Sequence, residues 1–267
     1  MKGKILRRLY ILLIMAFFYL PIFYTVVFSF NSSKSLSVFS GFSLQWYEKM
    51  FHNKDMVNSI FYTVIIALLA TLISTVVGTV TAIGLSKCNR LLRAAVEQVN
   101  DLPIMNPDIV TAIGLLMFFS TLAVKKGFMT LLLAHVMFCI PYVILSIMPK
   151  LRSLDPNLID AALDLGCTPM QAMTKVVVPQ ITSGIVSGAL IAFTMSFDDF
   201  VISYFVTGNG INNISIMVYT MSKRINPSIN ALSTVIIGII TLCLIVINVV
   251  PAVIDRARNK CRKETKK

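Results

Sequence analysis

Residues 56–86 read MVNSIFYTVIIALLATLISTVVGTVTAIGLS, without a single charged side chain. About 20 apolar residues are enough for a helix to cross the hydrocarbon core of a bilayer, so this stretch is long enough to span a membrane. It decides the fold class: we predict an all-α integral membrane protein built from helices of this kind.

Similar apolar stretches occur along the rest of the chain. We predict six transmembrane helices in a single transmembrane domain, over residues 9–30, 58–85, 102–124, 127–149, 181–206 and 231–254. The basic leader before the first of them is typical of a signal peptide. The apolar run behind it is too long for that, however, and no small-x-small cleavage site follows, so we expect a retained first helix.

The composition excludes a small soluble enzyme. Hydrophobic residues make up 56% of the 267 residues and charged residues 13%, with a mean hydropathy of +0.80. An ordinary soluble domain carries about 25% charged residues. A chain this apolar could not cover its own surface in water.

The Lys and Arg residues indicate the orientation of the chain. With the N-terminus inside, the inner segments hold 17 of the 24 basic residues and the outer segments hold 7. Positively charged loops stay on the cytoplasmic side, so we predict that both termini are cytoplasmic. The net charge of +12 then reflects topology and contact with lipid. No basic patch interleaved with aromatic residues points to nucleic acid.

No pattern of catalytic or metal-binding residues occurs in the sequence. The five cysteines form no CxxC pair, and His52 and His135 lie far apart. The phosphate-binding pattern GxxxxGK[ST] and the hydrolase pattern GxSxG do not occur either. We therefore expect a non-enzymatic chain without a metal or cofactor of its own, in which any nucleotide is hydrolysed by another subunit.

The first outer segment contains residues 41–48, which read GFSLQWYE. Trp46 and Tyr47 combine an apolar ring with a polar edge, which suits the headgroup region of a membrane. They are interpreted either as a lipid anchor or as part of a lid over a transport pathway.

The largest inner loop, residues 150–180, is too apolar and too patterned for a simple linker. The spacing predicts a short helix over 157–165 that ends at Gly166, and a second helix that opens at Thr168-Pro169 and runs through Val178. Two short helices between transmembrane spans can dock into a groove on a soluble partner. The alternative is a re-entrant connector without a partner.

The same loop carries a spaced motif. Asp160-Ala161-Ala162, three residues, Gly166, nine residues and Val176-x-Val178-Pro179 follow one another. This pattern resembles the EAA loop of ATP-binding cassette (ABC) importer permeases, EAA-x3-G-x9-I-x-LP. Asp replaces Glu, and Val replaces both Ile and Leu, while the spacing is intact.

Other stretches extend the resemblance over nearly the whole chain. They are Tyr19-Leu20-Pro21-Ile22, Ser29-Phe30-Asn31-Ser32-Ser33, Pro107-Asp108-Ile109-Val110, Asp164-Leu165-Gly166 and Phe193-Thr194-x-Ser196-x-Asp198-Asp199. Together they resemble the spermidine/putrescine permease family of ABC importers.

This resemblance implies a type I ABC importer permease fold with six spans, in a prokaryotic cytoplasmic membrane. It also implies partners: a second, related permease, two copies of an ATPase subunit that binds ATP and Mg, and an extracytoplasmic binding protein that delivers a polyamine. This chain would form half of a translocation pathway that works by alternating access. The residues implied in coupling to the ATPase are Asp160, Ala161, Ala162, Gly166 and Pro179.

Two acids in the fifth predicted span are candidates for substrate contact. An ionised carboxylate at the bilayer centre costs about 2.5–3.5 kcal/mol on insertion scales, so it normally faces a polar cavity or a partner. On one continuous helix, Asp198 and Asp199 would point about 100° apart, so only one of them would line a pathway. Carboxylates and aromatic faces suit a flexible chain of ammonium groups. The alternative is that both acids are structural.

Asp108, at the start of the third predicted span, is interpreted as a helix cap, with a substrate or exit-gate role as the alternative. Residues 183–188 read SGIVSG, a GxxxG spacing that permits close approach of another helix. Such spacings are common in membrane spans.

Two other functions stay open from the sequence. One is an ABC permease for another solute, for which the paired acids favour a cation. The other is a secondary transporter driven by an ion gradient, in which case the EAA-like spacing is chance. The sequence does not distinguish spermidine from putrescine.

Overall fold

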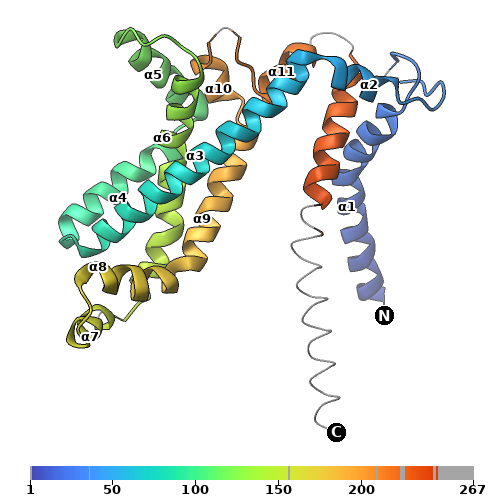
Figure 1. Cartoon of the computed structure of the whole chain (residues 1–267). Helices are drawn as coiled ribbons and strands as arrows, with labels where there is room; N and C mark the ends of the chain where they lie inside the picture. The colour runs from blue at the N-terminus through green and yellow to red at the C-terminus, as the bar shows by residue number, and fades with distance from the viewer. Residues whose placement is uncertain are drawn as a thin grey trace, which may run out of the picture. The chain divides into compact units, whose positions relative to one another are not determined.

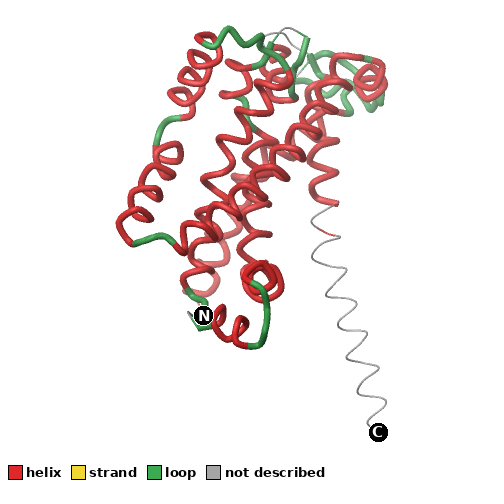
Figure 2. Tube along the Cα trace, turned by 60° about the vertical axis from the view of Figure 1, so that its left-hand side comes forward, coloured by secondary structure: helices red, strands yellow, loops and turns green. Residues whose placement is uncertain are grey.

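The computed structural model describes residues 2–35, 37–155, 157–208, 210–222, 226–242 and 245. Within these ranges the chain is helical, and its only strand-like feature is an isolated antiparallel bridge between Asn31 and Phe42 (Figures 1 and 2). In chain order the elements are α1 (Lys2–Ser29), α2 (Gln45–His52), α3 (Lys54–Lys87), α4 (Arg90–Met105), α5 (Asp108–Thr121), α6 (Phe128–Arg152), α7 (Leu158–Asp164), α8 (Pro169–Ala172), the π-helical turn η1 (Met173–Val177), α9 (Val178–Asp198), α10 (Val201–Val206) and α11 (Ile214–Ser222). An unlabelled apolar helix, Ser228–Leu242, follows.

The structure contains apolar helices long enough to cross a membrane. They are Leu6–Ser29, Lys54–Lys87, Phe128–Arg152 and Pro169–Asp198. A fifth span results if the bent pair α4 and α5 is counted as one. Helix Ser228–Leu242 covers the start of the sixth predicted span, 231–254, and all of that span beyond residue 242 except residue 245 lies outside the described residues.

The prediction of one helix over 102–124 is wrong. Residues up to Met105 belong to α4, and the chain turns by 104° before α5 begins at Asp108. Pro107 causes the break, because its ring lacks an N–H donor and keeps the preceding residue out of the helical region. Asn106 accordingly has extended backbone angles, φ −79° and ψ 145°.

The prediction of one helix over 181–206 is also wrong. α9 ends at Asp198, and Asp199 is extended, with φ −60° and ψ 125°, before α10 begins at Val201. At the other end the helix begins at Pro169 and not at residue 181. From Pro169 on, α8, η1 and α9 form one uninterrupted helix. The fifth predicted span is therefore a long helix, a break and a short helix.

The residues divide into two compact units, Asn58–Met217 and Met1–Val57 with Val218–Lys267. Helix α6 is the centre of the first unit, and α9 runs beside it (Figure 1). Gly184 and Gly188 of α9 allow this close approach. A Cβ at Gly188 would lie 3.2 Å from the Cα of Val143, and a Cβ at Gly184 would lie 3.2 Å from the carbonyl oxygen of Ser146. The close approach expected from the GxxxG spacing is confirmed.

The second unit contains α1, whose most apolar 18 residues include no buried residue. Behind α1 the chain folds around Asn31, which is fully buried and whose amide donates to the carbonyl oxygens of Ser35 and Val38 at 2.9 and 2.8 Å. The Trp46 indole N–H donates to the carbonyl oxygen of Asn31 at 2.6 Å. This local network fixes the first predicted outer segment against α2.

Candidate functional site

The loop that carries the EAA-like motif folds as an elbow of two short helices. α7 ends before Gly166, whose φ of +84° lies in the left-handed region that glycine tolerates best. The Thr168 hydroxyl accepts from the Gln171 N–H, and the Gln171 side chain accepts from the Thr168 N–H, which together form a capping box at the start of α8. Helix, glycine stop and helix start therefore lie where the sequence predicts them.

The elbow presents both polar and apolar side chains at its surface. Asp160 and Ala161 are exposed on α7, whereas Ala162 is buried. Leu165 is 86% exposed and Met170 is 73% exposed, on either side of Gly166. Both are large apolar side chains at the surface of the elbow. Pro179, the last residue of the motif, is exposed in the first turn of α9.

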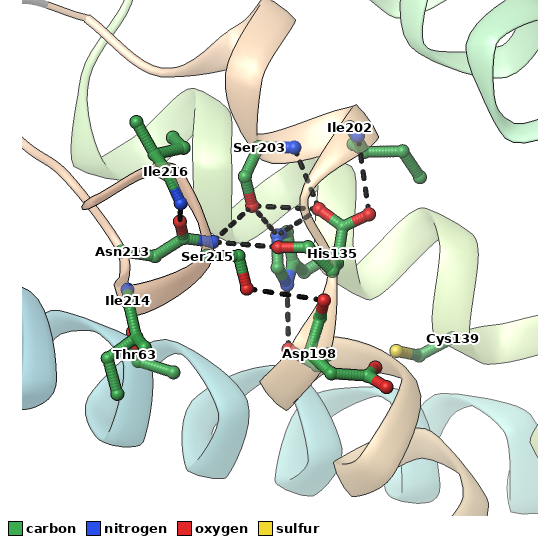
Figure 3. Close-up of polar contacts among 12 residues, drawn as sticks. Thr63, His135, Cys139, Asp198, Ile202, Ser203, Asn213, Ile214, Ser215 and Ile216 are labelled. Atoms are coloured by element: carbon green, nitrogen blue, oxygen red, sulfur yellow. Dashed lines mark hydrogen bonds and ion pairs between the residues drawn. The ribbon is translucent and has the colours of Figure 1, made fainter. Parts of the chain in front are cut away.

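A buried polar cluster lies at the break between α9 and α10, at the end of α9 that is opposite to the elbow (Figures 1 and 3). His135 of α6 is 2% exposed and is the centre of this cluster. Its Nδ1 lies 2.7 Å from the Ser196 hydroxyl, and its Nε2 lies 3.0 Å from the Ser203 hydroxyl. The imidazole therefore contacts both helices on either side of the break.

Asp199 closes the cluster and lies in the break, two residues before α10 begins at Val201. One carboxylate oxygen accepts from the N–H of Ile202 at 3.2 Å. The other accepts from the N–H and the hydroxyl of Ser203 at 2.7 and 2.8 Å. The latter oxygen also lies 3.5 Å from Nε2 of His135. A carboxylate that accepts from the first N–H groups of a helix stabilises its start.

The Ser203 hydroxyl fixes how the imidazole must be protonated. A hydroxyl has one hydrogen to donate, and Ser203 gives it to Asp199. Nε2 of His135 therefore has to donate to the Ser203 oxygen, and this oxygen also accepts from the Asn213 amide at 2.8 Å. In a neutral ring, Nδ1 then accepts from the hydroxyl of Ser196; this assignment is inferred from the network.

Asn213 and Thr63 extend the cluster to α11 and α3. The Asn213 amide also donates to the backbone carbonyl of Asp199 at 2.9 Å, and its oxygen accepts from the N–H of Ile216. The Thr63 hydroxyl accepts from the N–H of Ile214 at 2.8 Å. The start of α11 is thus held by side chains from outside this helix.

Asp198 and Asp199 differ in their surroundings. Asp198 is exposed, whereas the side chain of Asp199 is only 7% exposed. The backbone carbonyl of Asp198 accepts from the Ser215 hydroxyl at 3.2 Å (Figure 3). The two acids thus lie in different surroundings, and the cause is the break in the helix, not the 100° step along a continuous one.

The structure places the remaining predicted residues elsewhere. Asp108 is exposed in the first turn of α5, where the capping position belongs to Pro107, so the expected side-chain cap is wrong. Trp46 is only 4% exposed, so its ring does not face lipid as an anchor would. The Tyr47 hydroxyl lies 2.7 Å from the hydroxyl of Ser29. None of these three belongs to the polar cluster.

The sequence analysis missed His135, Asn213 and Ser203. His135 lies in an apolar span, where a polar ring indicates either function or internal hydrogen bonding. Its partners are 61 and 68 residues away in the chain, so sequence spacing could not identify them. Within the described ranges, no group of three or more His, Cys, Asp or Glu could hold a metal ion.

Known proteins resemble this chain over most of its length. Residues 74–260 match the family described as binding-protein-dependent transport system inner membrane component. The spermidine/putrescine transport system permease protein PotC of Haemophilus influenzae is 36% identical over 93% of this chain and 96% of its own length. The putrescine transport system permease protein PotI of Escherichia coli is 36% identical over 87% of this chain and 85% of its own length.

Solved structures support the fold. A chain of a bacterial ABC transporter that imports the acidic polysaccharide alginate matches with a TM-score of 0.70 at 14% identity, covering 94% of this chain and 95% of that one. The same type of transporter in complex with a periplasmic protein bound to an alginate pentasaccharide matches with a TM-score of 0.65, also at 14% identity, over 92% and 93%. At this identity the likeness concerns the fold alone. The matched family and the identity to its permeases lead to one conclusion: this chain belongs to the inner membrane components of binding-protein-dependent transport systems.

Proposed function

We propose that this chain is the permease subunit of an ATP-driven importer for polyamines, spermidine or putrescine, and forms half of the translocation pathway. The observation that carries this proposal is the 36% identity to a spermidine/putrescine permease over 93% of the chain. Identity of this extent includes both the elbow and the broken span. ATP and Mg are bound by a partner subunit, and this chain supplies no catalytic group.

The proposed topology has six spans and both termini in the cytoplasm. The predicted bounds stay 9–30, 58–85, 102–124, 127–149, 181–206 and 231–254, except that the third and fifth spans are broken. The 17 to 7 division of basic residues between inner and outer segments supports this orientation. Under it, the elbow lies on the cytoplasmic side and the polar cluster lies toward the outer side.

The elbow is proposed to couple the chain to an ATPase. The exposed Asp160, Ala161, Leu165 and Met170 offer a contact surface that a soluble partner can cover. Because α8, η1 and α9 are continuous, movement of the elbow is transmitted directly to the helix that ends at Asp198. The proposed assembly contains a second, related permease, two ATPase copies and an extracytoplasmic polyamine-binding protein.

Asp198 is proposed as the acid that meets the substrate. Its carboxylate is exposed at the end of a long apolar helix, and a bare carboxylate there is costly unless a cation or a polar cavity faces it. The ammonium groups of a polyamine supply such a cation. The carboxylate of Asp199 instead accepts hydrogen bonds from Ile202 and Ser203 within the buried cluster. Trp46, Tyr47 and Asp108 stay candidates for the pathway.

The alternative is a permease for another cationic solute, because an exposed carboxylate selects for charge and not for chain length. An ion-gradient-driven transporter is no longer favoured, because the family acts with binding proteins.

Uptake into proteoliposomes tests the proposal. The chain is purified with the subunits that accompany it, reconstituted with ATP inside, and supplied outside with the binding protein loaded with radiolabelled spermidine or putrescine. We expect ATP-dependent accumulation of label that unlabelled polyamine abolishes. Import of another cation in place of both polyamines would contradict the substrate assignment but not the permease assignment.

A further inference from the structure

We propose that His135 is a positioning residue, which holds the break between α9 and α10 so that Asp198 faces outward to the transported cation. The inference rests on the proposed function, since it assigns a role at the same site. His135 itself is 2% exposed and does not reach the surface at which Asp198 lies. Its effect on transport is therefore indirect.

The imidazole bridges the two sides of the break. Ser196, two residues before Asp198, lies on Nδ1 at 2.7 Å, and Ser203, five residues after Asp198, lies on Nε2 at 3.0 Å. Both ring nitrogens have partners, so the ring satisfies its hydrogen bonds only when both helices are in place. In a buried site an unmade hydrogen bond is costly, and this links the two helices through one side chain.

The break needs such support, because nothing in the local sequence imposes it. Residues 196–203 read SFDDFVIS, without Pro or Gly, so a continuous helix is sterically possible there. Asp199 leaves the helix and accepts three hydrogen bonds from Ile202 and Ser203. Nε2 of His135 lies 3.5 Å from the Asp199 oxygen that accepts from Ser203, and this contact favours the broken arrangement over a continuous helix.

The orientation of Asp198 follows from the break. The extended backbone of Asp199 separates the two carboxylates, so that one is buried at 7% exposure and the other is exposed. The Ser215 hydroxyl holds the Asp198 carbonyl, which no longer has a helical partner (Figure 3). Without the link through His135, the hydrogen bonds that keep Asp198 and Asp199 in different surroundings are weakened.

A double-mutant cycle between His135 and Asp198 tests the inference. His135→Leu, Asp198→Ala and the double variant are assembled in the full transporter, and uptake of spermidine is measured per assembled complex against the concentration of loaded binding protein. We expect each single variant to lower the maximal rate about tenfold, with little change in the half-saturating concentration. The double variant should be no slower than either single one, because His135 acts through Asp198.

Two conservative variants distinguish the roles of the two ring nitrogens. They also keep a polar side chain in the buried site, so the test does not depend on His135→Leu alone. His135→Gln carries an amide near the position of Nε2, so it can still donate to Ser203 and should recover much of the rate. His135→Asn places its amide near Nδ1, reaches only Ser196 and should stay slow. Rescue by Gln but not by Asn supports a link through Ser203 and Asp199.

Other results overturn the inference. Additive losses in the double variant would show that His135 acts independently of Asp198. Loss of assembled complex in every His135 variant, with a normal rate in what remains, would reduce His135 to a structural residue. If the wild-type complex does not import spermidine, the polyamine assignment fails, and the same cycle with the cargo that it imports decides the role of His135.

Discussion

Asp198 and Asp199 are neighbours in the chain, yet one carboxylate is exposed and the other accepts hydrogen bonds from Ile202 and Ser203. The buried acid stabilises the start of α10, and the exposed acid is the one that we propose meets the substrate. At the residue scale, two identical side chains therefore differ in their roles because they differ in their surroundings.

Alanine substitutions should separate the two roles. Asp199→Ala leaves the N–H groups of Ile202 and Ser203 and the Ser203 hydroxyl without their acceptor, so we expect a loss of stability of about 1–3 kcal/mol. Asp198→Ala removes a carboxylate that is exposed, so it should cost much less stability while uptake falls. Thermal aggregation of the detergent-solubilised proteins, together with uptake, measures both. Equal aggregation temperatures of the two variants would contradict this assignment.

A second residue-scale prediction concerns the contact between α6 and α9. Gly188→Val adds a side chain whose Cβ lies 3.2 Å from the Cα of Val143, so the helices must separate, at a cost of about 1–3 kcal/mol. Gly114→Val is the matched control, because a Cβ at Gly114 meets nothing within 4 Å. Only the first variant should lower the aggregation temperature; a loss of the same size in both would show that close packing is not the cause.

At the scale of elements, the elbow could be predicted from the sequence and the broken spans could not. Gly166 and the Thr168 cap are local signals, readable within a few residues. The break at Asp199 depends on His135 and Asn213, which are distant in the chain, while the apolar pattern continues across it. Pro107 was visible in the sequence, but a proline inside an apolar stretch is tolerated in membrane helices, so the 104° turn was not predicted.

The elbow should be the site of coupling. Ala161→Glu places a charge on its exposed face without disturbing buried Ala162, and Gly166→Pro is incompatible with a φ of +84°. Both variants should stay in the membrane but lose the link between ATP hydrolysis and uptake. Ala94→Glu, the same change at an exposed position of α4, is the control and should transport normally. Normal transport by both elbow variants would show that the elbow does not couple.

At the scale of the whole molecule, the sequence predicted the all-helical membrane class and the family, because composition and apolar lengths determine the class and a spaced motif identifies the relatives. The exposed apolar surface of α1 requires a lipid or a partner helix. The proposed orientation places Cys88 and Cys167 on the cytoplasmic side. Neither is fully buried, so both can react with a thiol reagent that reaches this side.

Thiol labelling tests this orientation. In a variant with Cys243 and Cys261 replaced by Ser, a membrane-impermeant maleimide added to intact spheroplasts should leave Cys88 and Cys167 unlabelled until the membrane is permeabilised. Ser37→Cys, at an exposed position of the predicted outer segment, is the control and should be labelled without permeabilisation. The reverse pattern would invert the topology and place the elbow on the wrong side for an ATPase.

We propose that this chain couples an ATPase to the delivery of a polyamine. The most direct measurement is the ATP hydrolysis of the reconstituted complex with and without the binding protein loaded with spermidine. We expect a clear rise in hydrolysis with the loaded binding protein, and none with the Ala161→Glu complex. Hydrolysis that is indifferent to the loaded protein in the wild type, or the absence of any co-purifying ATPase, would contradict it.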